Sequence, residues 1–198
     1  MKIFLISLVG LFFVACSTTY PAITEYRISV PKQKVKSPES SCKRDTLKVS
    51  QVFVTSSLMS KEMKYVVGEY KEYSYNESEW AEQPNKALSD AIVKVLEDSG
   101  LFAHVSSYKS FSSSNYTLET NVAAFTQHFS SDEKSSFVKI DMTFSLIDNS
   151  SAMVIASKHI VKEKKVMKAD AQSGVTALNE LLFTTLQEMT QWIAKGCK

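Results

Sequence analysis

The chain has 198 residues, with 23 Lys and Arg against 21 Asp and Glu and a formal net charge of +2. This near-neutral balance argues against a dedicated nucleic-acid-binding protein, which needs concentrated positive charge to displace counterions. The length is sufficient for one domain with a sizeable hydrophobic core.

The N-terminal segment has the features of an export signal. Lys2 is followed by an apolar run, Ile3–Val14, which is too short to span a bilayer as a helix and is typical of a cleaved signal. Its ending, Phe-Val-Ala-Cys16, resembles the bacterial lipobox, in which the Cys becomes the lipidated first residue of the mature protein. We therefore expect a lipoprotein-type signal peptide over 1–15, acylation of Cys16 with fatty acid such as palmitate, and a tether over 16–22. An ordinary signal peptide followed by an incidental Cys is the alternative.

Alternating apolar residues indicate strands in the first half of the chain. In chain order, the sequence predicts a strand over Ile23–Val30, a loop over 31–46, a strand over Leu47–Val54 with a bulge near Ser50, a short strand over Tyr65–Val67 and an exposed, Glu-rich segment with Tyr70, Tyr73 and Tyr75.

A helix follows, because Leu88, Ile92, Val95 and Leu96 are spaced for one helix face. Pro84 suits its first turn, and Gly100 suits a left-handed C-terminal cap.

The second half predicts long strands and a second helix. A short strand begins at Val105, and longer strands are expected over Tyr116–Phe125, Val138–Leu146 and Met153–Lys162, with a helix over Asp170–Ala194. Strict alternation in these strands indicates an antiparallel sheet with one buried face. The apolar stripe of the helix fits core packing better than a coiled coil. We expect a single α+β domain over 23–198, a mainly antiparallel sheet with two helices packed on one face.

Motifs for catalysis are absent from the sequence: it has no Gly-rich phosphate loop, no nucleophile elbow and no His-Glu-x-x-His. Three scattered His predict no metal site, and we expect no cofactor. Glu79 and Glu82 flank Trp80 and could act as an acid–base pair, although a favourable contact with the following helix dipole is the better interpretation.

A basic stretch is either a solvated strand end or a contact for anionic lipid headgroups; it contains Lys162, Lys164, Lys165 and Lys168.

Two cysteines remain besides Cys16, namely Cys42 and Cys197. In an oxidising compartment they have one intramolecular partner choice, so we expect a Cys42–Cys197 disulfide. Free thiols or intermolecular pairing are the alternatives.

The segment Glu79–Pro84, which reads Glu-Trp-Ala-Glu-Gln-Pro, leads into a helix that ends Ser-Gly-Leu-Phe at Phe102. This arrangement resembles the auxiliary lipoproteins of ABC-type transport systems, the PqiC-like family. The resemblance covers about residues 16–193 and includes further matching segments, namely the lipobox, Tyr26-Arg27-Ile28, Asn115-Tyr116-Thr117-Leu118-Glu119 and Leu146-Ile147-Asp148.

The resemblance implies a non-enzymatic protein that is lipid-anchored to the outer membrane and faces the periplasm. Its implied partners are an MCE-domain periplasmic subunit and the ABC permease and ATPase of a system that moves phospholipids. Trp80, Glu82 and Pro84 are candidate partner-binding residues, although burial of Trp80 in the core is the favoured alternative for that residue. An assembly or regulatory lipoprotein for cell-wall synthesis or a secretion channel is the second interpretation. An exported hydrolase is disfavoured by the missing motifs.

Overall fold

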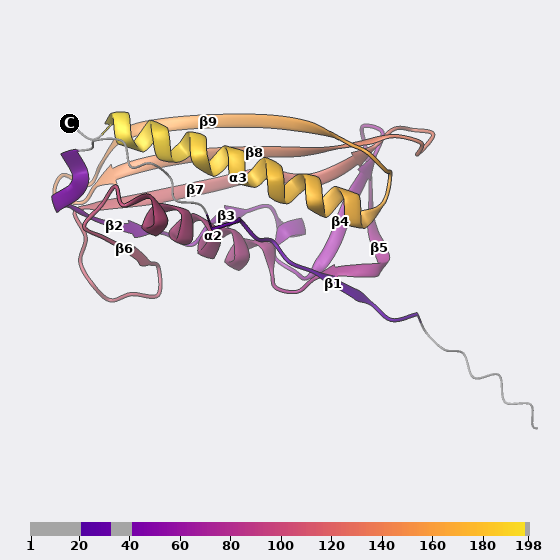
Figure 1. Ribbon diagram of the computed structural model, residues 1–198, viewed down its shortest axis with the longest axis horizontal. Coiled ribbons are helices and arrows are strands. Elements are labelled where there is room, and N and C mark those ends of the chain that lie inside the picture. Colours follow the sequence, from indigo (N-terminus) through magenta and orange to yellow (C-terminus); the bar gives the residue numbers. More distant parts are fainter. Residues whose placement is uncertain (1–20, 33–40, 197–198) are drawn as a thin grey trace, which may run out of the picture.

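The computed structural model describes residues 21–32 and 41–196 (Figure 1). The predicted signal peptide, the lipidation site Cys16 and the second disulfide cysteine Cys197 lie outside the described residues. Cys42 is 2% exposed in a short 3-10 helix, η2, at the end of the molecule where the C-terminal helix also ends (Figure 1). The Cys42–Cys197 disulfide stays a prediction.

The described chain forms a single α+β domain, as the sequence predicts. Its elements, in chain order, are β1 (Thr24–Tyr26), η2 (Ser41–Arg44), β2 (Thr46–Val49), β3 (Phe53–Val54), η3 (Ser56–Leu58), β4 (Glu62–Val67), β5 (Lys71–Trp80), α2 (Pro84–Ser99), β6 (His104–Ser107), β7 (Tyr116–Phe129), β8 (Ser136–Asp148), β9 (Met153–Val166) and α3 (Ala171–Gly196).

The nine strands belong to one sheet, in which β7 is central. The long strands β7, β8 and β9 are antiparallel, as are β4 and β5. The short strands add a parallel component that the sequence did not predict, because β2, β3 and β4 all pair with β7 in parallel and β1 pairs with β5 in parallel. The sheet is therefore mostly antiparallel with parallel additions.

Both helices cover the same face of the sheet (Figure 1). α2 lies against β2 and β6, and α3 runs along β7, β8 and β9. The buried face of β8 consists of alternate apolar residues, namely Val138, Ile140, Met142, Phe144 and Leu146. Leu182, Leu186 and Met189 of α3 pack into this core, which confirms core packing and not a coiled coil as the reason for the apolar stripe.

α2 has the predicted start and end. Pro84 occupies its first turn, and Gly100 adopts a left-handed conformation with φ of 62° while its N–H donates to the Glu97 carbonyl. Leu101 then folds back into the core, where it is fully buried.

Three segments differ from the prediction. The expected strand over Ile23–Val30 is reduced to the three residues of β1, and the chain over 27–30 is not part of a strand. The expected strand over Leu47–Val54 is divided into β2 and β3, because the Val52 N–H donates to the hydroxyl of Ser89 on α2 and not to a strand.

The expected exposed segment with three tyrosines contains a strand that was not predicted: Tyr73 and Tyr75 belong to the ten-residue strand β5, and Tyr70 lies in the turn before it. Tyr70 and Tyr73 are exposed, as expected. The rings of Tyr73 and Tyr75 lie 5.7 and 4.5 Å from the ring of Tyr65 on β4, and Tyr65 contacts Phe129. This aromatic cluster stabilises a strand whose composition is otherwise polar.

A buried polar network joins β5, β7, β8 and the start of α3. Gln127 of β7 is 3% exposed; its Oε1 accepts from the Tyr75 hydroxyl at 3.0 Å, and its Nε2 donates to the Ser136 hydroxyl at 2.9 Å. The same Nε2 donates to the Asp170 carbonyl at 3.3 Å. Burial, with a smaller contribution from Tyr65, raises the pKa of the Tyr75 hydroxyl, so it stays protonated as the donor.

Candidate functional site

An extended segment, Arg27–Pro31, passes between the two helices; we call it the strap. The Asn179 side chain on α3 binds it at two points, since Oδ1 accepts from the Ser29 N–H and Nδ2 donates to the Arg27 carbonyl, both at 3.0 Å. Lys94 of α2 donates to the Val30 carbonyl at 3.3 Å, and the Val30 side chain is buried. The strap is thus fixed to both helices.

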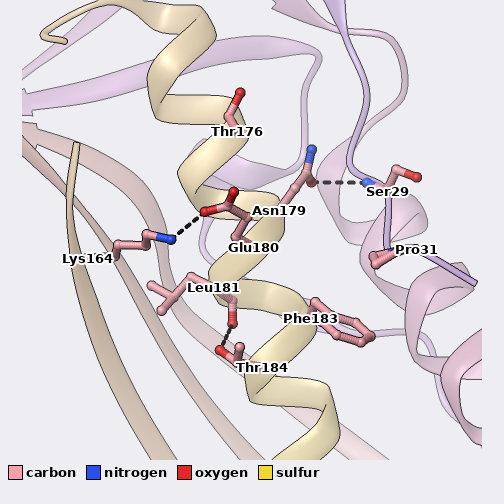
Figure 2. A pocket seen from close by; sticks show the side chains of 9 residues that line it. All are labelled: Ser29, Pro31, Lys164, Thr176, Asn179, Glu180, Leu181, Phe183 and Thr184. Carbon is pink, nitrogen blue, oxygen red and sulfur yellow. Dashed lines mark hydrogen bonds and ion pairs between the residues drawn. The ribbon is translucent and has the colours of Figure 1, made fainter. Parts of the chain in front are cut away.

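A groove with a volume of about 700 Å³ runs along α3 between the strap and β9 (Figure 2). Lys164 reaches from β9 to the carboxylate of Glu180 on one side, while the contact between Asn179 and Ser29 closes the other side. Its lining residues are Ser29, Pro31, Lys164, Thr176, Asn179, Glu180, Leu181, Phe183 and Thr184. The groove combines apolar side chains with amide and hydroxyl groups and with the ion pair between Lys164 and Glu180.

A second groove, with a volume of about 440 Å³, lies on the other flank of the strap. It is lined by Arg27, Ile28, Ala81, Glu82 and Ala87. Of the three candidate partner-binding residues, Glu82 is exposed in this groove. We call the strap and its two grooves the strap surface.

The other two candidate residues, Trp80 and Pro84, have buried side chains. Trp80 is 3% exposed and its ring lies 5.9 Å from that of Phe125, so the burial alternative is the one that the structure bears out. Neither side chain is available on the surface for direct contact with a partner.

The structure does not place Glu79 at the first turn of α2, where a contact with the helix dipole was expected. Glu79 belongs to β5, where it is opposite Glu62, and its carboxylate lies 4.0 Å from Lys61 Nζ. The first turn of α2 contains no acidic residue.

The predicted basic stretch is partly neutralised by α3. Lys158 and Lys162 of β9 lie 3.3 and 3.1 Å from the carboxylate of Glu188, and Lys164 pairs with Glu180. The hydrogen bond from Lys162 is the main reason why the pKa of Glu188 is lowered, and Lys158 adds to it. Two of the four lysines in the stretch, Lys162 and Lys164, therefore pair with carboxylates of α3, although the Lys164 side chain is still 46% exposed.

Neither His128 nor His159 lines the two grooves of the strap surface. On the open face of the sheet, His159 lies 2.8 Å from Asp141, and His128 stacks on Phe137 at 5.0 Å. In residues 21–32 and 41–196, no three His, Cys, Asp or Glu side chains gather as a metal site would require. In the same part of the chain, no helix has the length and apolar character needed to cross a membrane.

Replacing Asn179 by Leu should release the strap from α3. The change removes two hydrogen bonds, each worth about 0.5–1.5 kcal/mol, while the core beneath stays intact. We expect faster amide hydrogen exchange over the strap, with little change in the exchange of β7 and β8. Thr176→Leu, one turn earlier on the same exposed side of α3, is the matched control, and equal exchange in the two variants would contradict the role of Asn179.

Comparison with known proteins places the fold and the family. The family model for the "ABC-type transport auxiliary lipoprotein component" matches residues 26–190. The crystal structure of protein XCC0632 from Xanthomonas campestris is similar, with a TM-score of 0.78 and 20% identity over 87% of this chain and 95% of that one. The crystal structure of an uncharacterized protein gives a TM-score of 0.68 and 20% identity over 87% and 99% of the two chains. No curated protein matches the sequence. The chain belongs to the family of ABC-type transport auxiliary lipoprotein components.

Proposed function

We infer that the protein is a non-enzymatic accessory of an ABC-type transport system that moves phospholipids between the two membranes. Cys16 carries the lipid anchor at the outer membrane, and the domain faces the periplasm. The partners are the MCE-domain periplasmic subunit and, through it, the permease and ATPase. The family match over residues 26–190 is the observation that carries this proposal.

The position of the first described residues supports a holding role. Pro21 is five residues after Cys16, a distance of at most about 18 Å along an extended chain, so the start of the domain stays close to the bilayer. From there the chain passes into β1 and the strap, which is hydrogen-bonded to α2 and α3. Force on the tether is thus carried into the helices and not into a free loop.

The strap surface is the proposed contact for the transporter. It presents two grooves and an exposed carboxylate, Glu82, next to the point where the tether enters the domain. Trp80 and Pro84 contribute to this contact only indirectly, because they hold the β5–α2 connection from within the core.

Replacing Cys16 by Ala should abolish membrane attachment. Without the thiol there is no site for acylation, so we expect the protein to move from the membrane pellet to the soluble fraction and to lose labelling by radioactive palmitate. Ser17→Ala is the neighbouring control and should keep both properties. Palmitate labelling that persists in Cys16→Ala would contradict the anchor.

Affinity purification of the full-length, membrane-anchored protein tests the partner. We expect the MCE-domain subunit to co-purify, and Glu82→Lys to reduce its recovery without a change in thermal stability. If a cell-wall synthase or a secretion channel co-purifies in its place, the proposal is wrong and the assembly or regulatory interpretation replaces it.

A further inference from the structure

The strap continues the course of β1 past the end of β5. The two strands pair in parallel up to Tyr26 opposite Trp80, and the Ala81 N–H still donates to the Tyr26 carbonyl at 2.7 Å. β5 then ends, and the chain turns into α2 at Pro84. The strap runs on between the helices and belongs to no strand pair (Figure 1). One of its edges therefore loses its pairing partner where β5 stops.

The hydrogen bonds of the strap show which way its backbone groups point. In an extended chain, the N–H and C=O of one residue point to one side, and those of the next residue point to the opposite side. The Arg27 carbonyl and the Ser29 N–H bind the Asn179 amide on α3. The Tyr26 carbonyl points to the end of β5, and the Val30 carbonyl points to α2. By this alternation, the backbone groups of residue 28 also point to the side of β5 and α2.

Three backbone groups on that side have no hydrogen-bond partner among residues 21–32 and 41–196. They are the N–H and C=O of Ile28 and the N–H of Val30. Their repeat of two residues is that of a strand edge, and an edge of this kind is a template for pairing with another extended chain. We call these three groups the open edge of the strap.

The second groove of the strap surface lies along the open edge. Its walls include Ile28 on the strap, Ala81 after β5 and Ala87 on α2, and its volume is about 440 Å³. The two alanine side chains are small, so they leave room for another backbone beside the open edge. Arg27 and Glu82 also line the groove, and neither forms an ion pair with another described residue. The groove thus offers backbone groups together with one positive and one negative charge.

Contacts on its other side hold the strap in place. The Asn179 side chain makes two hydrogen bonds to it, and the Val30 side chain is 3% exposed in the core. A chain that pairs with the open edge consequently does not have to order the strap first, which lowers the entropic cost of binding.

The long edge strand β9 is less suited to pairing with a partner. In the described part of the chain it pairs with β8 alone. Lysines on an edge strand discourage the addition of another strand, and β9 contains Lys158, Lys162, Lys164 and Lys165. The open edge of the strap has no lysine and has a groove beside it.

We propose that the transporter partner contributes an extended peptide segment, which adds to the open edge as a β-strand and fills the second groove. This proposal rests on the proposed function and names how its partner is recognised. The segment takes the place that β5 would occupy if it continued beyond Trp80. It carries small side chains toward Ala81 and Ala87, and an acidic and a basic side chain that complement Arg27 and Glu82.

Recovery of the MCE-domain subunit with the full-length, membrane-anchored protein tests this mode of binding. Ile28→Pro removes an N–H of the open edge, and Ile28→Ala is the matched control because it shortens the same side chain but keeps the N–H. Ala87→Leu fills the groove from α2, and Ala103→Leu is its control because Ala103 is exposed after the other end of α2. We expect recovery to fall about tenfold in Ile28→Pro and Ala87→Leu, through a lost pairing bond or a steric clash, and to change little in the controls.

Hydrogen exchange in the recovered complex, resolved to single residues, reports on the pairing itself. The amides of Ile28 and Val30 should exchange more slowly in the complex than in the protein alone, whereas the Ser29 amide, already bonded to Asn179, should change little. Thermal denaturation checks the fold of each variant, and Ala87→Leu decides the test if Ile28→Pro is less stable.

Unchanged recovery of the subunit with Ala87→Leu, or equal exchange at positions 28 and 30 with and without the subunit, overturns strand addition and leaves the proposed partner in place. If the subunit does not co-purify with the unsubstituted protein, the proposed function fails, and strand addition fails with it.

Discussion

Replacing Trp80 by Ala should lower the free energy of unfolding by about 3–5 kcal/mol. The side chain is 3% exposed and packs against Phe125. Trp80 is the last residue of β5, and its backbone N–H donates to the Lys61 carbonyl at 2.8 Å. Removal of the indole leaves a cavity beneath the β5–α2 connection that the surrounding core fills only in part. Urea denaturation followed by circular dichroism measures the change.

Two matched variants separate burial from contact with a partner. Trp80→Phe should retain most of the stability, and Glu82→Ala, two residues further along, should change it by less than about 0.5 kcal/mol because Glu82 is exposed. At a temperature where Trp80→Ala stays folded, its co-purification with the transporter should equal that of the unsubstituted protein. Lost co-purification in a fully folded Trp80→Ala protein would contradict an internal role.

Local patterns were sufficient to predict much of the fold. In α2, the residues of the apolar face and the two ends at Pro84 and Gly100 are all close in sequence. In β8, buried and partly buried residues alternate without a break from Ser136 to Leu146. β5 was missed because its stability comes from residues distant in sequence: Tyr65 on β4 and Phe129 on β7 form the aromatic cluster that holds its tyrosines. Polar strands of this kind cannot be identified from alternation of apolar residues.

The candidate site was predictable to a smaller extent. Of the three candidate residues around Trp80, only Glu82 is on the surface. The strap was missed because Asn179 contacts residues about 150 positions earlier in the chain. The lysines that face α3 could have been identified from the sequence. Side chains alternate between the two faces of a strand, and Lys158, Lys162 and Lys164 are each two or four residues from the buried Ile160, so they lie on its face.

Gly174→Ala is expected to destabilise the fold although Ala is the better helix former. A Cβ at position 174 would lie 2.5 Å from Gln127 Cδ and closer still to Oε1. Gln127 cannot move aside without breaking its bonds to Tyr75, Ser136 and the Asp170 carbonyl, which are buried or partly buried. We expect a loss of about 2–4 kcal/mol, which combines overpacking with unsatisfied buried polar groups and exceeds the helix-propensity gain of about 1 kcal/mol.

The chain offers an internal control for this prediction in the same helix. Apart from the backbone of α3 and the neighbours in the chain, no atom of the described residues lies within 4 Å of a Cβ built at Gly196. Gly196→Ala should therefore leave stability unchanged or slightly increased. In a Gln127→Ala background the obstructing amide is gone, and Gly174→Ala should then be close to neutral. A cost at position 174 that is the same with and without the Gln127 side chain would mean that the close approach of α3 to β7 does not depend on this network. If the cost of Gly174→Ala instead depends strongly on the Gln127 side chain, as expected, then the lack of a side chain at position 174 is what allows α3 to pack closely on the sheet. Through Asn179, the same helix also binds the strap.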